Sequence, residues 1–313
     1  MLLKLSSPIF IIILIVAFLI IIISVISYFE CKTFKISKYH IKNVKNLDTA
    51  SFVFISDFHN KIYKDNYKKL IDEVFNLNPN YIILGGDFID FSKFNKTFKI
   101  VNYENSINFI KKLSKYRDNF KKNGDCNLKR IFFTFGNHEL RLRDISSNEE
   151  FFNAYEQFIK VLNDNDIEII DNKTVKLSGG ISFSGLSLYD GYYYNKLSFK
   201  KNHKKIEKEV LDKYFASLDK ETFNIISFHK PDYFRDLFDY GFDLVISGHN
   251  HGGLVRLPGI GAIISPDLDL FPKYDYGKYD FDNKFLIISS GLGEHLAKLR
   301  INNLPEICYI CIR

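Results

Sequence analysis

Five short apolar runs, each followed within a few residues by aspartate, histidine or asparagine, constrain the fold of this chain more than any other feature of its sequence. The runs are SFVFIS (51–56), YIILGG (81–86), RIFFTFG (130–136), FNIISF (223–228) and DLVIS (243–247). Short runs rich in β-branched and aromatic residues are typical of buried strands. We therefore expect a protein whose strands lie mostly inside its core.

Segments whose apolar residues recur at helical intervals lie between several of these runs. Apolar residues recur at helical intervals over 67–75 and over 104–122, and we expect further helices near 204–218 and 232–239. A Gly-Gly pair within 175–185 predicts a hairpin, and two more strands are expected at 285–290 and 306–312. Strands that alternate with helices and then dominate the sequence predict an α/β fold, a two-sheet sandwich flanked by helices.

The N-terminal residues predict a membrane helix. From Ile9 to Ser27 the chain reads IFIIILIVAFLIIIISVIS, without a charge. About twenty apolar residues span a bilayer as a helix, whereas the apolar part of a signal peptide, the competing interpretation, has about 7–15. We interpret residues 1–30 as an uncleaved single-pass anchor, 31–46 as a polar tether and 47–313 as the folded domain. The lysines that follow the helix favour the cytoplasmic face: Lys32, Lys35, Lys38, Lys42 and Lys45.

Composition restricts the kinds of partner. The net charge of +6 comes from 43 basic and 37 acidic residues, and the lysines are scattered rather than clustered. We therefore expect no nucleic-acid partner.

Cys308 and Cys311 form a CxxC, but they lie in an apolar run with no second cysteine pair to complete a zinc site. We interpret them as two small residues of a strand.

The polar residues that follow the five runs all lie just after the carboxyl end of an expected strand. They are Asp57, His59, Asp87, Asp90, Asn137, His138, His229, His249 and His251. The carboxyl ends of strands in α/β folds form the crevice where ligands bind. Any one of these stretches also fits a turn, a cap or a core histidine. Because five separate segments repeat the pattern, we prefer a shared site to five coincidences.

The residue types point to a metal site. Imidazole, carboxylate and amide ligands without thiolate suit Mn, Fe or Zn. A carboxylate on a short loop can bridge two ions, and two ions about 3.5–4 Å apart clamp the attacking and leaving oxygens of a phosphoryl displacement. Glycines at 85, 86, 136, 248, 252 and 253 allow the backbone to turn sharply beside these residues.

The order of these motifs resembles the calcineurin-like metallophosphoesterases over about residues 50 to 313. The motifs read Asp57-Phe58-His59, Gly86-Asp87-Phe88-Ile89-Asp90, Gly136-Asn137-His138-Glu139, His229 and Gly248-His249-Asn250-His251. The stretches GHNHGGLVRLPGIG and SSGLGEHLAKLRINNLPEI look like a small bacterial branch with an N-terminal membrane segment. That branch commonly has Gln where this chain has Leu254, so we expect no polar role there.

The resemblance implies a role for each matched residue. One of two divalent or trivalent ions would be held by Asp57, His59 and His251, and the other by Asn137, His229 and His249. Asp87 and a hydroxide would bridge the two ions. His138 would protonate the leaving alkoxide, and Asp90 would fix the tautomer and orientation of His138. Glu139 fits equally well a supporting residue of the site and a helix cap.

The expected reaction is hydrolysis of a phosphodiester or pyrophosphate by attack of a hydroxide held by the two metals. A phosphorylated small molecule or a lipid-linked envelope compound fits an enzyme at a membrane, and the alternative is a non-catalytic metal-binding scaffold. The sequence identifies no substrate-binding residues. Arg141 and Arg143 fit an exposed helix face better than a phosphate site, YDGYYY (189–194) fits either a substrate loop or a plain surface loop, and 91–129 could supply a cap helix.

Overall fold

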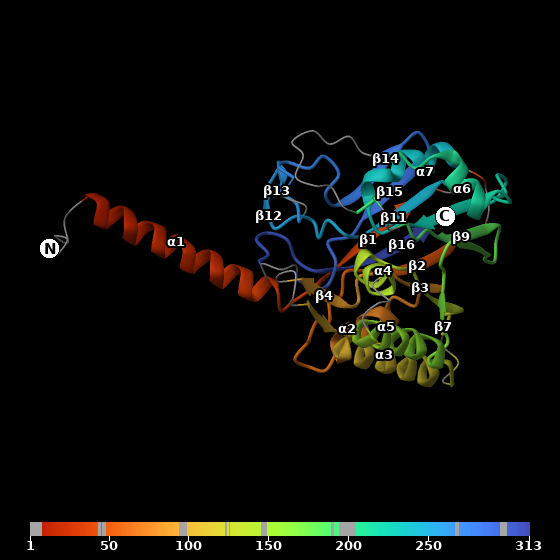
Figure 1. Ribbon diagram of the computed structural model, residues 1–313, viewed down its shortest axis with the longest axis horizontal. Coiled ribbons are helices and arrows are strands. Elements are labelled where there is room, and N and C mark those ends of the chain that lie inside the picture. Colours follow the sequence, from red (N-terminus) through yellow and green to blue (C-terminus); the bar gives the residue numbers. More distant parts are fainter. Residues whose placement is uncertain are drawn as a thin grey trace.

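The computed structural model covers the whole chain. The residues described below are 8–42, 45, 48–93, 99–122, 124, 126–144, 149–188, 191–193, 205–266, 269–294 and 299–313. Within them the chain folds into two packed sheets with helices on both outer faces, and a long N-terminal helix projects from one side (Figure 1). The α/β sandwich expected from the sequence is confirmed.

Each large sheet has six strands in the described part of the chain. The order in the first sheet is β1 (Lys35–Ile41), β16 (Glu306–Ile312), β2 (Ala50–Ile55), β3 (Tyr81–Leu84), β6 (Arg130–Phe133) and β7 (Ile167–Ile169). The order in the second sheet is β14 (Gly277–Phe281), β15 (Lys284–Ile288), β11 (Leu244–Ser247), β10 (Phe223–Ser227), β9 (Ile181–Gly185) and β8 (Lys173–Lys176). β8 and β9 form the hairpin predicted at the Gly-Gly pair.

Alternation along the central strands builds two apolar layers. In β2, Phe52 and Phe54 belong to the layer between the sheets, whereas Val53 and Ile55 belong to the layer under the helices. Phe132 of β6 contacts Phe183 of β9 across the two sheets, with ring centroids 5.1 Å apart. Because successive side chains of a strand point to opposite faces, a strand covered on both faces must be apolar throughout.

The helices cover the outer faces of the sheets. The first sheet carries α2 (Lys68–Asn76), α3 (Glu104–Lys122) and α5 (Glu149–Asp164), and the second carries α6 (Lys208–Phe215) and α7 (Phe234–Tyr240), which follows the short 3-10 helix η1 (Pro231–Tyr233). α3 has the bounds predicted from spacing. It packs into the core, where the rings of Phe109 and Phe58 stack at 4.9 Å, so it is a layer helix and does not cap the site.

Two short hairpins extend beyond the sandwich. β4 (Asp90–Lys93) pairs with β5 (Lys99–Asn102), and β12 (Val255–Leu257) pairs with β13 (Gly261–Ile264). Both hairpins follow predicted site residues directly, β4 beginning at Asp90 and β12 four residues after His251. Cys308 and Cys311 lie three residues apart on β16, with Cys308 buried, so they face opposite sides of the sheet, as expected of two strand residues.

The N-terminal helix α1 (Pro8–Glu30) is long and apolar enough to cross a membrane, and none of its most apolar 18-residue window is buried. Lys35–Ile41, which we expected within a polar tether over 31–46, instead form β1, which pairs in parallel with β16 over its full length. The tether prediction does not hold for this stretch. The KISKYHI sequence is half-buried at the sheet edge and ends in the fully buried Ile41.

The C-terminal end of α1 is bonded to the rest of the molecule. The Ser27 hydroxyl accepts a hydrogen bond from the Arg300 backbone N–H at 3.0 Å. The Glu30 carboxylate accepts the backbone N–H groups of Asn302 and Asn303 at 3.0 and 2.9 Å. These three hydrogen bonds hold the helix end in one orientation, because two of the three bonded residues, Arg300 and Asn303, also support the loops of the sandwich.

Arg300 links those loops. Its guanidinium is 2% exposed and donates to the carbonyl oxygens of Ser290, Gly291, Gly293 and Asn303. Burial lowers the pKa of Arg300, although nearby acidic groups oppose that shift. A planar group with five donors is suited to binding several carbonyls at once.

We predict that Arg300→Lys lowers the free energy of unfolding by about 2–3 kcal/mol, because one ammonium leaves buried carbonyls without donors. The measurement is urea-induced loss of near-ultraviolet circular dichroism for the full chain in detergent micelles. Arg235→Lys, at an exposed position, serves as the control and should change stability by less than about 0.5 kcal/mol. Equal losses in the two variants would contradict the role assigned to Arg300.

Candidate metal centre

The site lies where strands of both sheets end. β2, β3 and β6 run parallel to one another, as do β10 and β11, so the residues that follow these strands gather at one edge of each sheet. All seven predicted ligands come from these positions: Asp57, His59, Asp87, Asn137, His229, His249 and His251. The structure brings all seven together in the two clusters described next.

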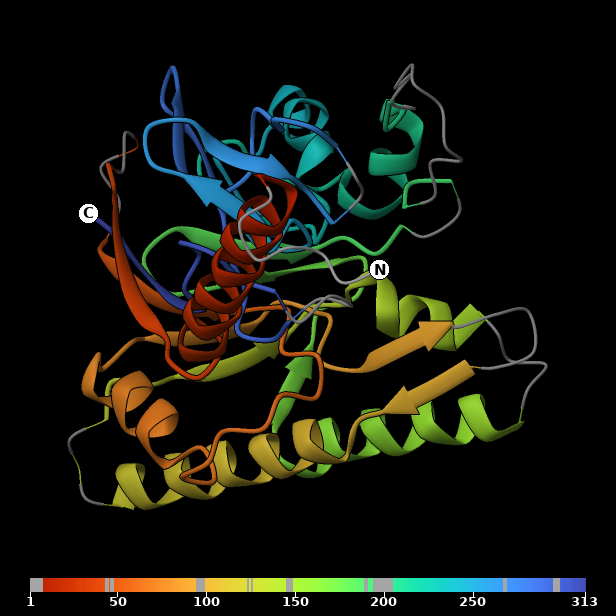
Figure 2. The same ribbon diagram turned by 90° about the vertical axis from the view of Figure 1, so that its left-hand side faces the viewer.

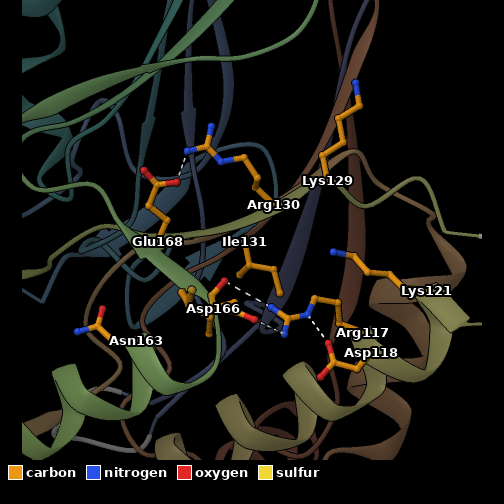
Figure 3. A pocket seen from close by; sticks show the side chains of 10 residues that line it. Arg117, Asp118, Lys121, Lys129, Arg130, Ile131, Asn163, Asp166 and Glu168 are labelled. Carbon is orange, nitrogen blue, oxygen red and sulfur yellow. Dashed lines mark hydrogen bonds and ion pairs between the residues drawn. The ribbon is translucent and has the colours of Figure 1, made fainter.

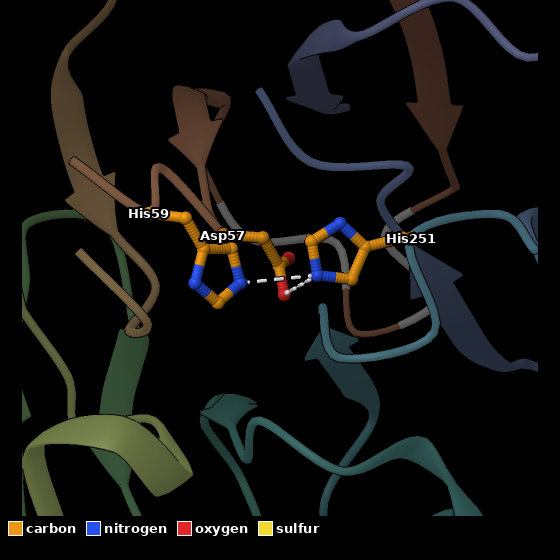
Figure 4. A group of neighbouring side chains, drawn as sticks. All are labelled: Asp57, His59 and His251. Atoms are coloured by element: carbon orange, nitrogen blue, oxygen red, sulfur yellow. Dashed lines mark hydrogen bonds and ion pairs between the residues drawn. The ribbon is translucent and has the colours of Figure 1, made fainter. Parts of the chain in front are cut away.

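The first cluster contains Asp57, His59 and His251 (Figure 4). The two Nε2 atoms of His59 and His251 lie 3.1 Å apart. His251 Nε2 is 3.4 Å from Asp57 Oδ1. The potential ligand atoms of the three residues all lie within 4.8 Å of one another, so one cation can contact all of them.

The second cluster contains Asp87, His229 and His249, with ligand atoms again within 4.8 Å of one another. His229 Nε2 lies 3.0 Å from Asp87 Oδ2. Asn137 joins this cluster through its Oδ1, which is 2.9 Å from His249 Nδ1. This grouping is the one that the resemblance implies for the second ion.

Asp87 connects the two clusters. Its Oδ2 is 3.9 Å from Nε2 of His59, which belongs to the first cluster, and 3.0 Å from Nε2 of His229, which belongs to the second. Asp57 Oδ1 is likewise 3.5 Å from His229 Nε2. A carboxylate in this position is suited to contact two neighbouring cations.

The backbone of the site is strained. Five of the seven predicted ligand residues adopt left-handed conformations, with φ of 51° at Asp57, 45° at His59, 52° at Asp87, 67° at His249 and 47° at His251. Such a conformation costs of order 1–3 kcal/mol for a residue other than glycine, and it is typical of functional sites. Glycine is required beside it: a Cβ at Gly136 would lie 2.2 Å from Asp87 Oδ1, and one at Gly248 would lie 2.3 Å from Asp57 Oδ2.

The charges of the cluster call for cations. Asp57 and Asp87 are buried, and no lysine or arginine of the described residues forms an ion pair with either. Burial by itself would raise the pKa of Asp87, but the imidazoles of His229, His138 and His59 hold it well below its usual value. Two buried carboxylates surrounded by imidazoles are stable when positive charge lies between them.

His229 shows where such a charge would sit. Its Nδ1 lies 2.9 Å from the carbonyl oxygen of Gly85, to which it donates, so Nε2 is directed at the two carboxylates. Nε2 is buried without a hydrogen-bond partner among the described residues. Burial lowers the pKa of His229, but Asp87 and Asp57 outweigh it and raise the pKa to about 10. The Nε2 position therefore favours a positive charge, and the donor set fits a metal ion.

His138 and Asp90 lie beside the clusters. His138 Nε2 is 3.9 Å from Asp87 Oδ2, and a carboxylate oxygen of Asp90 lies within 4.8 Å of ring nitrogens of both His138 and His59. The backbone N–H of Phe91 donates to His138 Nδ1 at 2.9 Å. In neutral His138 this bond leaves the proton on Nε2, the nitrogen nearer the clusters. The motif spacing did not reveal the contribution of the Phe91 N–H.

Glu139 supports the site more directly than the sequence indicated. Its buried carboxylate accepts four backbone N–H groups at 2.8–3.0 Å, from Asp87, Phe88, Ile89 and Gly136. Burial and the charge of Asp87 raise the pKa of Glu139 to about 7, against the opposing effect of these N–H groups. Because Gly136 precedes α4 (Asn137–Asp144), both of the interpretations offered above apply: Glu139 caps the helix and fixes the loop that carries Asp87.

The weaker candidates have other roles. Arg143 pairs with Asp171 at 3.2 Å, and the half-buried Arg141 lies over the Phe91 ring, so α4 presents a less exposed face than expected. Residues 189, 190 and 194 of YDGYYY lie outside the described residues. Tyr193 is buried, with its ring 5.6 Å from that of His249. This tyrosine packs behind a ligand and is part of neither an exposed substrate loop nor a plain surface loop.

A separate cavity of about 530 Å³ lies near the amino end of β6, opposite the metal clusters (Figure 3). Both arginines that line it already have partners. Arg117 donates to the carbonyl oxygens of Asn165 and Asp166, and Arg130 pairs with Glu168. We therefore assign this cavity no anion-binding role.

Comparison with known proteins agrees with the geometry. The family model "Calcineurin-like phosphoesterase" matches residues 50–253. The uncharacterized metallophosphoesterase YkuE of Bacillus subtilis is 33% identical over 31% of this chain and 34% of its own length. The uncharacterized metallophosphoesterase YkoQ of the same organism is 21% identical over 83% of this chain and 82% of its own. UDP-2,3-diacylglucosamine pyrophosphatase LpxG of Chlamydia muridarum is 25% identical over 85% of this chain and 84% of its own.

The matched region contains both metal clusters and the loop fixed by Glu139. The family match covers more than half of the 313 residues, and the relatives named above are metallophosphoesterases or a pyrophosphatase. This chain belongs to the calcineurin-like phosphoesterase family.

Proposed function

We propose that this protein is a membrane-anchored phosphoesterase that uses two metal ions to hydrolyse a phosphodiester or pyrophosphate bond. The observation that carries the proposal is the position of Asp87, whose Oδ2 lies 3.0 Å from His229 of one cluster and 3.9 Å from His59 of the other. Manganese, iron and zinc suit the imidazole, carboxylate and amide donors. When bound, such a pair supplies hydroxide near neutral pH and neutralises charge on the phosphoryl oxygens.

The residues of the site have three roles in this proposal: they hold the ions, they protonate the leaving oxygen, and they position the ligand loop. In this proposal Asp57, His59 and His251 would hold one ion, Asn137, His229 and His249 would hold the other, and Asp87 would contact both. His138 donates its Nε2 proton to the leaving oxygen, because the Phe91 N–H occupies Nδ1 and Asp90 lies close to the same ring. Glu139 keeps Asp87 in its left-handed conformation through the three N–H groups of the 87–89 loop.

A membrane location is supported by α1 and its contacts. The helix is exposed along its apolar length, and its C-terminal end is hydrogen-bonded to residues 300–303. Removal of the helix as a signal sequence would break those bonds, so we infer an uncleaved anchor. The lysines after the helix favour the cytoplasmic face. The printed name of LpxG supports a lipid-linked pyrophosphate as one candidate substrate.

Asp87→Asn should reduce hydrolysis of bis-p-nitrophenyl phosphate by about a thousandfold, because the charge that binds both ions contributes several kcal/mol. The measurement is turnover by the full chain in detergent micelles with Mn²⁺. Asp282→Asn, at an exposed position, is the matched control and should retain normal turnover. Full activity of Asp87→Asn would exclude the proposed bridge.

His138→Ala should lower kcat by about 10²–10⁴-fold with an alkyl phosphodiester, because general acid catalysis contributes about that much. The loss should be much smaller with a p-nitrophenyl ester, whose leaving group needs no proton. Metal content, measured by mass spectrometry, should not change, and His40→Ala at an exposed position of β1 is the control. A non-catalytic scaffold would show the same metal content but no turnover even before mutation.

Glu139→Gln should weaken Mn²⁺ activation by about 10–100-fold, the usual effect of losing a residue that orients metal ligands. Each carboxylate oxygen accepts two N–H groups, and the amide NH₂ of glutamine would face one of these pairs of donors. The measurement is the Mn²⁺ concentration that gives half-maximal activity. Glu150→Gln, in the exposed first turn of α5, is the control, and an unchanged midpoint in Glu139→Gln would refute the positioning role.

A further inference from the structure

Exposed apolar side chains are distributed unevenly over the domain. Outside α1, the large apolar residues exposed in the described chain are Ile62, Phe152, Leu257, Ile260, Leu270 and Phe271. Four of them belong to β12, its hairpin and the segment beside it, with exposed fractions of 42% at Leu257, 64% at Ile260, 69% at Leu270 and 61% at Phe271. We call these four residues the apolar platform.

The platform is one small structural unit. β12 and β13 form an antiparallel hairpin, and Leu270 and Phe271 add to its second strand, with the Phe271 N–H donating to the Ile263 carbonyl at 2.9 Å. The hairpin starts just after the ligand loop, where the Leu254 N–H donates to Ile264 at 3.0 Å. The platform is therefore an extension of the loop that carries His249 and His251.

The same unit is bonded to the segment that holds α1. Arg256 donates its backbone N–H to the Ile301 carbonyl at 3.0 Å, and Ile301 donates to Leu254 at 3.3 Å. Residues on either side of Ile301 bond to Ser27 and Glu30 of α1. Both views show the β12–β13 hairpin on the side of the domain from which α1 projects (Figures 1 and 2).

We propose that the apolar platform enters the membrane–water interface beside α1 and holds the metal centre at the bilayer surface. The inference rests on the anchoring role proposed above for α1. A long apolar helix determines where the bilayer lies, and the hydrogen bonds at its end keep the platform next to that boundary. Apolar side chains at such a boundary are buried among lipid headgroups and acyl chains to a depth of about 5–10 Å.

The residues around the platform suit a lipid surface better than a second copy of the chain. Tyr28 and Phe29, both more than half exposed, stand at the end of α1, where aromatic residues favour the headgroup level. The exposed Lys32 lies over the Tyr28 ring, and the exposed Lys64 is close enough to interact electrostatically with Tyr28. The exposed Lys273 is two residues from Phe271. Lysines near a bilayer attract anionic headgroups. Ile62, 67% exposed, adjoins Lys61, which donates to the Cys31 carbonyl just after α1.

This arrangement specifies the source of substrate. The ligand loops at 57–59 and 249–251 both continue into segments that contact the end of α1 or carry the platform. A phosphate ester attached to a lipid would reach these loops without leaving the interface. The class of substrate that fits is therefore an amphiphile with its phosphate at headgroup depth.

The natural chain has no tryptophan, so single substitutions provide site-specific probes. Ile260→Trp and Phe271→Trp report on the platform. The matched control is Phe152→Trp on α5, because the Phe152 side chain is 43% exposed. Each full-length variant is reconstituted into phosphatidylcholine–phosphatidylglycerol vesicles, with and without brominated acyl chains. Near-ultraviolet circular dichroism verifies the fold of each variant.

Both platform probes should show blue-shifted emission and about twofold quenching by brominated lipid, because the indole would reach the acyl boundary, whereas Phe152→Trp should show neither effect. Platform probes that iodide quenches as readily as the control would overturn the proposal. A blue shift that depends on protein density and not on brominated lipid would identify a second copy as the partner, and would also overturn it. These readouts are independent of turnover, so they separate a failed platform from a failed enzyme.

Discussion

Two buried carboxylates, Asp57 and Asp87, with no lysine or arginine partner in the described chain, are the constraint on which the rest of the structure depends. Buried charge is costly unless it is compensated, and here the groups around it are imidazoles, the Ser56 hydroxyl and the backbone N–H groups of His138 and His249. The left-handed backbone at five ligand residues adds to that cost. Bound metal ions would offset both the cost of burying the carboxylates and the cost of the strained backbone, because they bind the carboxylates and the imidazole nitrogens together.

The surrounding structure holds this arrangement in place from several directions. Glu139 fixes the Asp87 loop, and Arg300 gathers the carbonyls of the 290–293 loop. That loop supports Asp57 in turn, since the Gly293 N–H donates to the Asp57 carbonyl at 2.6 Å. Asn303 donates to the carbonyls of His251 and Gly253. Each supporting residue lies far in sequence from at least one group that it orients.

These supports also join the metal centre to α1. The Asn303 backbone N–H donates to the Glu30 carboxylate, and the Asn303 side-chain amide donates to the His251 carbonyl. One residue therefore connects the end of the apolar helix to a predicted metal ligand. An enzyme built this way would meet its substrate at a defined depth and orientation, and the apolar platform extends the same surface. The proposed function and the proposed membrane position would therefore depend on one set of hydrogen bonds.

The sequence by itself determined the central strands, the α/β class, the helix at 104–122 and the strand-end positions of the nine candidate site residues, because local periodicity carries that information. Only the tertiary structure decided the pairing of β1 with β16, the N–H groups on Glu139, the Phe91 contact with His138 and the docking of α1. These depend on bonds between distant residues, such as Ser27 and Arg300, 273 positions apart. A local pattern cannot specify them, because the partner is chosen by how the two sheets pack.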